Sequence, residues 1–136
     1  MHSTNYEGTF IAIAEDSVAE RGVAPPEKAE NPSVASRTWR MIAEHPYQYT
    51  SDDVIFTVWA DRRGIAEEDR AAAREEFFSK GRACMRASDL GKKYGWGIHH
   101  DDQGRVALVG VDSDEYRSFV ESDDVKVLKA MRSSRR

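Results

Sequence analysis

The sequence has little of what several protein classes require. It holds one cysteine in 136 residues, Cys84, which excludes an intramolecular disulfide and leaves no CxxC pair or Cys/His cluster for structural zinc. No apolar run reaches the ~18 residues of a membrane span. The first residues, MHSTNYEGTF, lack the basic start and apolar segment of a secretory signal. We therefore expect a cytoplasmic protein without a membrane segment.

Recognisable phosphate-binding and metal-binding motifs are also missing. The glycine-rich stretch GKKYGWGIHHDDQGRVALVGV, residues 91–111, has neither the spacing of a P-loop nor that of a dinucleotide fingerprint. Gly95 suits a left-handed residue after a helical turn, and Gly97 a place where another group approaches a strand closely. His99 and His100 are consecutive in a predicted strand, so they point to opposite faces and are badly placed to share an ion. No metal site and no cofactor is predicted.

The composition that is present predicts a folded chain with one core. Hydrophobic residues make up 40 % of the chain and aromatic residues 10 %, which is more apolar material than disordered chains carry. A length of 136 residues is typical of one domain. We predict a single domain over residues 1–136, with a long proline-containing loop at 15–32 and a frayed basic tail at 132–136.

Periodicity and capping residues predict a mixture of strands and helices. Alternation in TFIAIA predicts a strand over 9–14, and WGIHH and RVALVGV around the turn-former DDQG predict a hairpin over 96–111. Helices are predicted over 33–45 after Asn31 and Pro32, from Ser51 to Gly64, over 66–81, after Ser88, and from Ser113 to Val120. The run VIFTVW in the second of these also suits a strand, and VKVLKAM suits either a strand or a helix.

These elements predict an α+β domain. Its small antiparallel sheet would combine the N-terminal strand with the 96–111 hairpin, and three or four helices would cover the sheet. Non-local pairing of the first strand with the hairpin would close the fold.

Four segments of the chain resemble one protein family. They are MHSTNYEGTFIAIAED, HPYQYTSDDV, FFSKGRACMRASDLGKKYGWGIH and KAMRSSRR. They are similar to the pattern MHxTNYxxTFIxxAED, NPYxYTSDDV, FFSKGxxCxRxSxLxKxYGWGIH and KAMRSxR of a family of small bacterial and fungal proteins classed as a domain of unknown function. The resemblance covers nearly the whole chain. It implies no activity, cofactor or catalytic residue.

Basic residues are concentrated in the C-terminal part of the chain. Residues 1–79 hold 15 acidic and 8 basic side chains, whereas residues 80–136 hold 9 acidic and 12 basic ones. Cations beside aromatic planes suit phosphate and nucleobase recognition. The net charge of −4 and the lack of an RNA-binding motif make nucleic acid the less favoured ligand. We therefore predict a binding module for an anionic, phosphorylated small molecule, held by Arg86, Lys92, Lys93 and Trp96.

Two other functions stay open at this point. Cys84 lies among basic residues, and nearby cations favour the reactive thiolate. His99 beside an aspartate could act as an acid or base. The first alternative is therefore a small enzyme that uses His99 or Cys84, with Tyr94 as a further candidate, in a pocket beside the hairpin. The second is a protein-interaction domain that works through its acidic helices.

Overall fold

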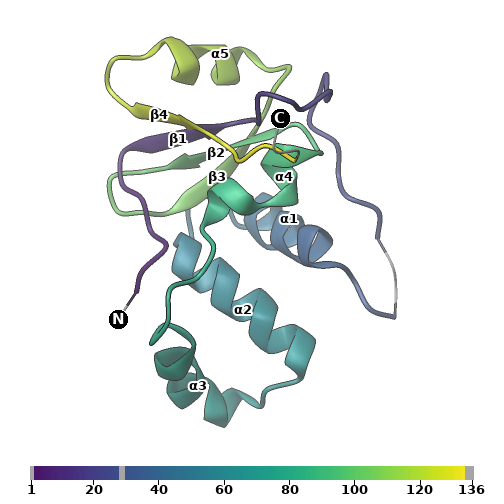
Figure 1. Ribbon diagram of the computed structural model, residues 1–136, viewed down its shortest axis with the longest axis vertical. Coiled ribbons are helices and arrows are strands. Elements are labelled where there is room, and N and C mark those ends of the chain that lie inside the picture. The colour runs from purple at the N-terminus through teal and green to yellow at the C-terminus, as the bar shows by residue number, and fades with distance from the viewer. Residues whose placement is uncertain (1, 28–29, 134–136) are drawn as a thin grey trace.

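The computed structural model describes residues 2–27 and 30–133 and contains a four-stranded mixed sheet (Figure 1). The strands are β1 (Thr9–Ala12), β2 (Trp96–His100), β3 (Val106–Gly110) and β4 (Lys126–Lys129), in the order β3-β2-β1-β4. β1 pairs antiparallel with β2, which forms a hairpin with β3, so the α+β class and the predicted pairing are confirmed. The sheet is not purely antiparallel, because β4 pairs parallel with β1.

Helices cover both faces of this sheet. They are α1 (Val34–Glu44), α2 (Ser51–Arg63), α3 (Arg70–Phe77), α4 (Asp89–Lys92) and α5 (Asp114–Glu121). α1, α2 and α4 lie on one face, α5 lies on the other, and α3 packs on the far end of α2 (Figure 1). Ile11 and Ile98 point into the α1 and α2 side of the core, whereas Phe10 packs with Tyr116 on the α5 side. None of the described helices is long and apolar enough to cross a membrane.

Side-chain caps set the starts of the first two helices. Ser33, not Asn31, caps α1, because its Oγ accepts from the backbone N–H of Ser36 at 3.1 Å and leaves Pro32 outside the helix. Thr50 caps α2 in a capping box with Asp53, one residue before the predicted start. The left-handed Gly64 ends α2 as predicted, with φ of 65°. The helical interpretation of VIFTVW is therefore confirmed.

The helix predicted over 66–81 is shorter in the structure. A 3₁₀ turn, Glu67–Asp69, precedes α3, and α3 ends at Phe77 rather than near Gly81. The Nε of Arg82 donates to the carbonyl oxygen of Phe77 at 2.8 Å, so a side chain satisfies this helix end in place of a glycine cap. Phe77 and Phe78 are both buried there, and the end of the helix lets these consecutive side chains enter the same cluster.

The segment before β1, residues 2–8, crosses α2 and is called the strap below. It is held by Asp52, which is 3 % exposed. The carboxylate of Asp52 accepts hydrogen bonds from Ser3 Oγ at 2.8 Å and from both the backbone N and the Oγ1 of Thr4 at 2.6 Å. Asn5 Oδ1 in turn accepts from the backbone N of Asp52 at 2.9 Å. The positive end of the α2 dipole also stabilises this carboxylate.

β2 places its two histidines on opposite faces, as predicted. The half-buried His99 stacks on Phe119 of the α5 side, with ring centroids 4.2 Å apart. His100 is fully buried on the other side, where its ring meets the edge of Tyr6 at 5.4 Å. Among the described residues, neither ring nitrogen of His100 has a hydrogen-bond partner. Burial lowers the pKa of His100 to about 4, so the ring is neutral at pH 7.

Gly97 allows β2 and β1 to pack under α5. A Cβ at this position would overlap Phe10 Cζ and lie 2.9 Å from Tyr116 Cε2. Phe10 is fully buried and cannot withdraw. The predicted close approach at Gly97 is therefore confirmed, and the approaching group is an aromatic ring of the protein itself.

The Gly97→Ala substitution is expected to destabilise the protein by about 1–3 kcal/mol, because an added methyl group overpacks a rigid aromatic cluster. The measurement is the free energy of unfolding in urea. Gly81→Ala is the matched control, since a Cβ there meets nothing within 4 Å. A Gly97→Ala protein as stable as the Gly81→Ala protein would contradict this packing.

His100 should make stability depend on pH. Its pKa is about 4 in the folded protein against an ordinary 6.5, so below pH 6.5 the unfolded chain takes up a proton that the folded chain does not. The stability that the neutral His100 ring contributes is therefore complete above pH 6.5 and is lost as the pH falls toward 4. From pH 7.5 to 5.0 the wild type should lose about 2 kcal/mol more unfolding free energy than His100→Leu. The exposed control His2→Leu should lose as much as the wild type.

Candidate functional site

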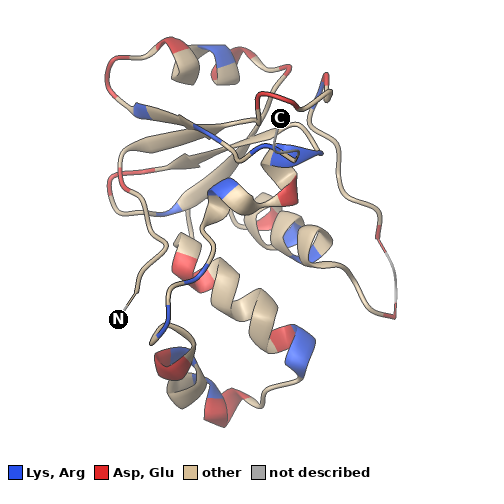
Figure 2. Ribbon diagram, viewed as in Figure 1, with Lys and Arg blue, Asp and Glu red and all other residues tan. Residues whose placement is uncertain are grey.

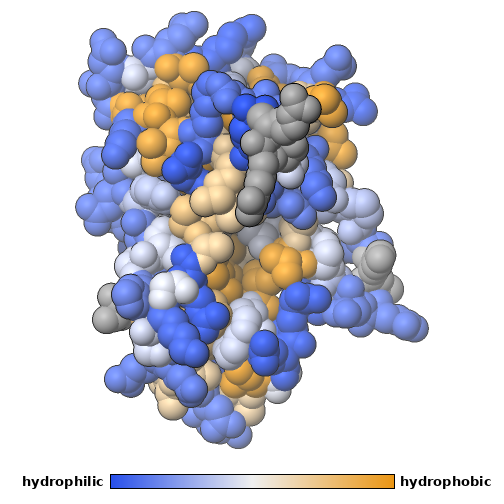
Figure 3. All heavy atoms as spheres, in the orientation of Figure 1, coloured by the Kyte–Doolittle hydropathy of each residue, from blue (hydrophilic) through white to orange (hydrophobic). Residues whose placement is uncertain are grey.

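A pocket of about 660 Å³ opens between α1, one side of α2 from Ile55 to Arg63, the end of α3 and residues 82–89, which lead from the connection after α3 into the start of α4. In the space-filling view, apolar atoms lie in a hollow near the middle of the visible face, with hydrophilic atoms around it (Figure 3). Pockets of roughly 300–1,000 Å³ commonly hold small-molecule ligands. The size of this pocket therefore suits a metabolite.

Four side chains on one side of α2 form a wall of the pocket. Ile55, Val58, Trp59 and Arg62 line it and recur at i, i+3, i+4 and i+7, so they form a single stripe along the helix. The helix also buries Phe56 and Ala60 against α3 and Val54 against the sheet. Ile55 and Val58 also pack in the core under the sheet, and Trp59 packs in the cluster with Phe77, so this wall of the pocket is the outer edge of the core.

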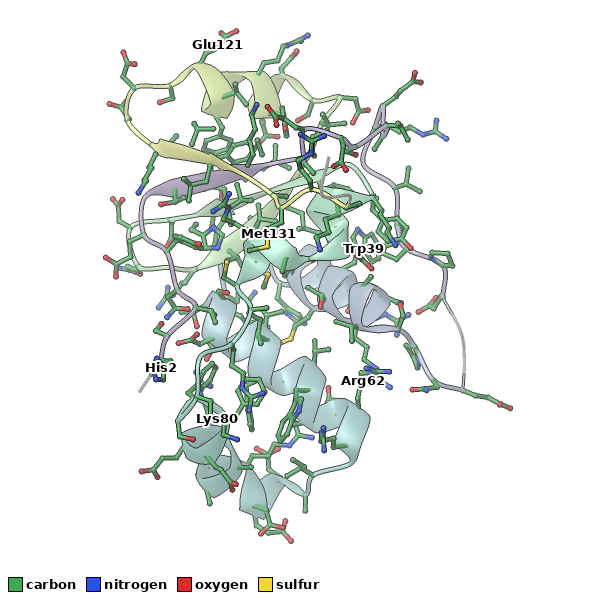
Figure 4. All side chains as sticks on the ribbon, in the orientation of Figure 1. His2, Trp39, Arg62, Lys80, Glu121 and Met131 are labelled. Carbon is green, nitrogen blue, oxygen red and sulfur yellow. The ribbon has the colours of Figure 1, made fainter. Side chains whose placement is uncertain are left out.

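Three arginines surround the mouth of the pocket. Arg62 and Arg63 lie at the end of α2, and Arg82 lies on the segment between α3 and α4. Figure 2 shows basic residues in both places, and Figure 4 labels Arg62. The Cζ of Arg63 lies 4.8 Å from the ring centre of Trp59, and that of Arg82 lies 4.0 Å from the ring centre of Phe77. Stacking on a ring fixes a guanidinium while its edge stays available for hydrogen bonds.

These three arginines have no carboxylate partner among the described residues. The described lining of the pocket holds these three arginines and one acidic residue, Asp89, so it carries a net positive charge. We call this site, with Arg62, Arg63 and Arg82 at its mouth, the arginine pocket.

Cys84 lies in the wall of the arginine pocket, partly buried. Its Sγ is hydrogen bonded to Tyr6 Oη of the strap at 3.2 Å, and either group can donate. Burial, followed by the hydrogen bond with Cys84, raises the pKa of Tyr6 above its usual value, so the phenol stays protonated at neutral pH. The sequence-predicted candidate Cys84 therefore borders a cavity and has a protonated hydroxyl beside it.

The basic residues predicted to bind an anion lie outside this pocket. The Nε of Arg86 donates to the carbonyl oxygen of Lys129 at 2.7 Å, which directs that edge of the guanidinium toward β4. Lys92 is the last residue of α4, and Lys93 caps the helix. Lys93 and Tyr94 border a shallow hollow formed with loop residues 18–23. A ligand-binding role for these lysines and Arg86, and a catalytic role for Tyr94, stay predictions.

Trp96, the fourth residue predicted to bind an anion, contacts Gly22 and Val23, in the described part of the segment predicted as a loop. Its Nε1 donates to the carbonyl oxygen of Val23 at 2.9 Å. A Cβ on Gly22 would come within 2.9 Å of the Trp96 ring, so this part of the loop packs directly on the indole. Gly95 is left-handed as predicted, with φ of 77°, and a Cβ there would collide with the carbonyl oxygen of Arg21. The structure thus gives Trp96 a structural partner, and its role toward a ligand stays a prediction.

The second candidate for catalysis, His99, lies on the opposite side of the sheet from Cys84. The Nδ1 of His99 is 2.8 Å from the hydroxyl oxygen of Tyr47, a residue with a left-handed φ of 60°. Burial lowers the pKa of His99, although Asp101 and Asp102 act to raise it. His99 and Cys84 therefore cannot act on one ligand at the same time. Within the described part of the chain, no three His, Cys, Asp or Glu side chains gather in a metal-binding arrangement.

The mouth of the arginine pocket was not predicted from the sequence. Arg62 and Arg63 precede the helix stop Gly64, where cations ordinarily complement the helix dipole. The stripe of Ile55, Val58 and Trp59 with Arg62 was the available signal. At helical spacing, this apolar stripe ends at the positively charged Arg62.

Comparison with known proteins identifies a family. No curated protein and no solved structure matches the chain. One family description, "Family of unknown function (DUF6157)", matches over residues 1–136. This match confirms the family resemblance that the four sequence segments indicated. The chain therefore belongs to DUF6157, a family of unknown function.

Proposed function

We propose that the protein is a binding module for a small anionic ligand and that the arginine pocket is its binding site. The observation that carries the proposal is the group of three guanidinium groups, unpaired with any described carboxylate, around a 660 Å³ pocket. Arginine binds carboxylate and phosphate groups through paired N–H donors. Such a mouth selects a ligand by its negative charge.

The carboxylates of α2 are engaged elsewhere, which supports the proposal. Asp52 accepts the hydrogen bonds of the strap. Asp53 pairs with Arg74 and Asp61 pairs with Arg70, both at 2.9 Å. These α3 arginines therefore occupy the acidic groups that α2 itself offers. The charge of Arg62 and its neighbours is left for a ligand or for solvent.

The shape of the site favours a small molecule over nucleic acid. Arg62, Arg63 and Arg82 line one pocket and do not follow an extended groove. Single-stranded nucleic acids, in contrast, are bound along grooves with successive stacking platforms. The anionic ligand predicted from the sequence is thus retained in the proposal, at a different location from Arg86, Lys92, Lys93 and Trp96.

The proposal predicts that charge decides binding between two dyes of similar shape. Anilinonaphthalene sulfonate, which is anionic, should bind more tightly than the neutral N-phenyl-1-naphthylamine when fluorescence is titrated. Arg62→Gln combined with Arg63→Gln should weaken binding of the anionic dye about 10-fold or more, since a charge-assisted hydrogen bond contributes about 1.5–3 kcal/mol. Binding of the neutral dye should hardly change.

The matched control is Arg117→Gln, an exposed arginine of α5 that pairs with Asp114 and lies away from the pocket. It should leave both dyes unaffected. Equal affinity of the wild type for the two dyes, or equal losses in the control and the pocket variant, would refute the proposed site.

A second candidate function is a small enzyme with Cys84 as its nucleophile. The hydrogen bond between Cys84 Sγ and Tyr6 Oη, in the wall of a pocket, favours it. A phenol that donates to sulfur stabilises the thiolate, the form that attacks an electrophile. His99, the alternative residue predicted for catalysis, has no part in this candidate, because it lies across the sheet.

Alkylation of Cys84 tests this candidate. At pH 7.5 the thiol should react with iodoacetamide faster than free cysteine does, and Tyr6→Phe should slow the reaction because the thiolate loses a donor. The ratio of the iodoacetate rate to the iodoacetamide rate should exceed that of free cysteine about fivefold, since nearby cations attract the anionic reagent. A rate no higher than that of free cysteine would rule out an activated thiol.

A further inference from the structure

The lining of the arginine pocket indicates what the uncharged part of its ligand is. We propose that the ligand is an amphipathic oxyanion, with an alkyl or aryl body of medium length and a single anionic head, rather than a hydrophilic phosphorylated metabolite. This inference rests on the proposed function, because it assumes that the arginines bind the head. It adds the chemistry of the body, which the wall below the arginines determines.

The wall of the pocket is predominantly apolar. Its apolar members come from α1, α2, the end of α3 and the segment before α4: Val34, Ala35, Ile55, Val58, Trp59, Phe77, Ala83, Met85 and Ala87. Val58, Phe77 and Met85 are themselves core residues with 4 % exposure or less. These three side chains fix the shape of the wall, and the more exposed Val34, Ala35 and Ala83 supply apolar surface that a ligand can cover.

Small side chains create the volume of the pocket. Ala35 on α1 and Ala83 and Ala87 on the connecting segment line it, where larger residues would fill it. Trp59 and Phe77 supply aromatic faces, and each carries a stacked arginine. An aromatic face beneath a guanidinium places apolar contact and anion recognition next to each other. A ligand that satisfies both must be apolar close to its charged group.

The described lining has three neutral polar side chains, Thr38, Cys84 and Ser88, and Thr38 is only 6 % exposed. Ser88 Oγ already accepts from the backbone N of Leu90 at 3.2 Å, and Cys84 Sγ is bonded to Tyr6 at 3.2 Å. Sugar hydroxyls placed against this wall would lose hydrogen bonds to water without replacement, which costs free energy for each group. An alkyl body instead gains about 0.8 kcal/mol for each methylene that it buries.

The test uses displacement of anilinonaphthalene sulfonate by hexanoate, octanoate and decanoate, each below its micellar concentration. The dissociation constant should fall about fourfold for each added methylene, and the gain should stop once the chain outgrows the pocket. Two comparison compounds separate body from head. Glucose 6-phosphate keeps an oxyanion on a hydrophilic body, and 1-octanol keeps the alkyl body without the charge. Both should bind at least 10-fold more weakly than octanoate.

Two variants assign the effect to this pocket. Ala35→Phe places a ring inside the lining and should remove most of the dependence on chain length. Ala43→Phe is the control, because Ala43 is an exposed residue of the same helix that does not line the pocket. The control should keep the wild-type dependence. Arg62→Gln should weaken octanoate and leave 1-octanol unchanged.

The outcomes distinguish this inference from the proposed function. Glucose 6-phosphate that binds as well as octanoate, or affinities that do not change with chain length, would overturn the apolar body while an anion site remained. Octanol that binds as tightly as octanoate, with no effect of Arg62→Gln, would overturn the anion site itself. The absence of binding by both oxyanions would overturn both.

Discussion

The buried carboxylate of Asp52 is the interaction on which the arrangement around the pocket depends. It accepts three hydrogen bonds from Ser3 and Thr4, which fixes the strap across the start of α2. The strap then carries Tyr6 to Cys84 and to His100, and runs into β1 at the centre of the sheet. A buried charge is stable only when donors satisfy it, so the strap and the carboxylate stabilise each other.

Helix α2 connects two of the hydrophobic clusters with the candidate site. Its side chains contribute to the core under the sheet and to the cluster with α3, and the outer edge of these contacts lines the arginine pocket. The acidic residues of α2 are bound to the strap and to α3. The arginines at its end therefore lack local partners, and this imbalance gives the pocket its positive mouth. One helix thus relates the stability of the fold to the proposed binding of an anion.

Comparison of sequence and structure shows where local rules were sufficient. Alternation over Thr9–Ala14 predicted β1, which ends two residues earlier at Ala12, and the turn DDQG predicted the hairpin, because neighbouring side chains and turn residues encode them. Gly64 and Ser113 marked a helix end and a helix start for the same reason. Errors of one to a few residues occurred where two capping groups compete, as at Ser33, or where a distant side chain replaces a glycine cap, as at Arg82.

The candidate site shows where local rules were insufficient. The cationic and aromatic residues between 86 and 96 are close in sequence, yet the structure uses Arg86 to contact β4 and Trp96 to contact the loop. The arginine pocket instead combines Arg62 and Arg63 with Arg82, about twenty positions apart. Tyr6 reaches Cys84 across 78 positions. No periodicity reports such contacts, because they form only when separate elements pack.

By itself the sequence determined the N-terminal strand, the hairpin, the positions of most helices, the α+β class and the opposite faces of His99 and His100, because backbone geometry and short-range capping act within a few residues. The tertiary structure alone decided that residues 126–129 form a parallel strand beside β1, that the strap reaches Cys84, and that three arginines meet around one apolar pocket. These features depend on burial and on hydrogen bonds between distant segments. Such burial and hydrogen bonding stabilise the protein only once the distant segments have packed into the core.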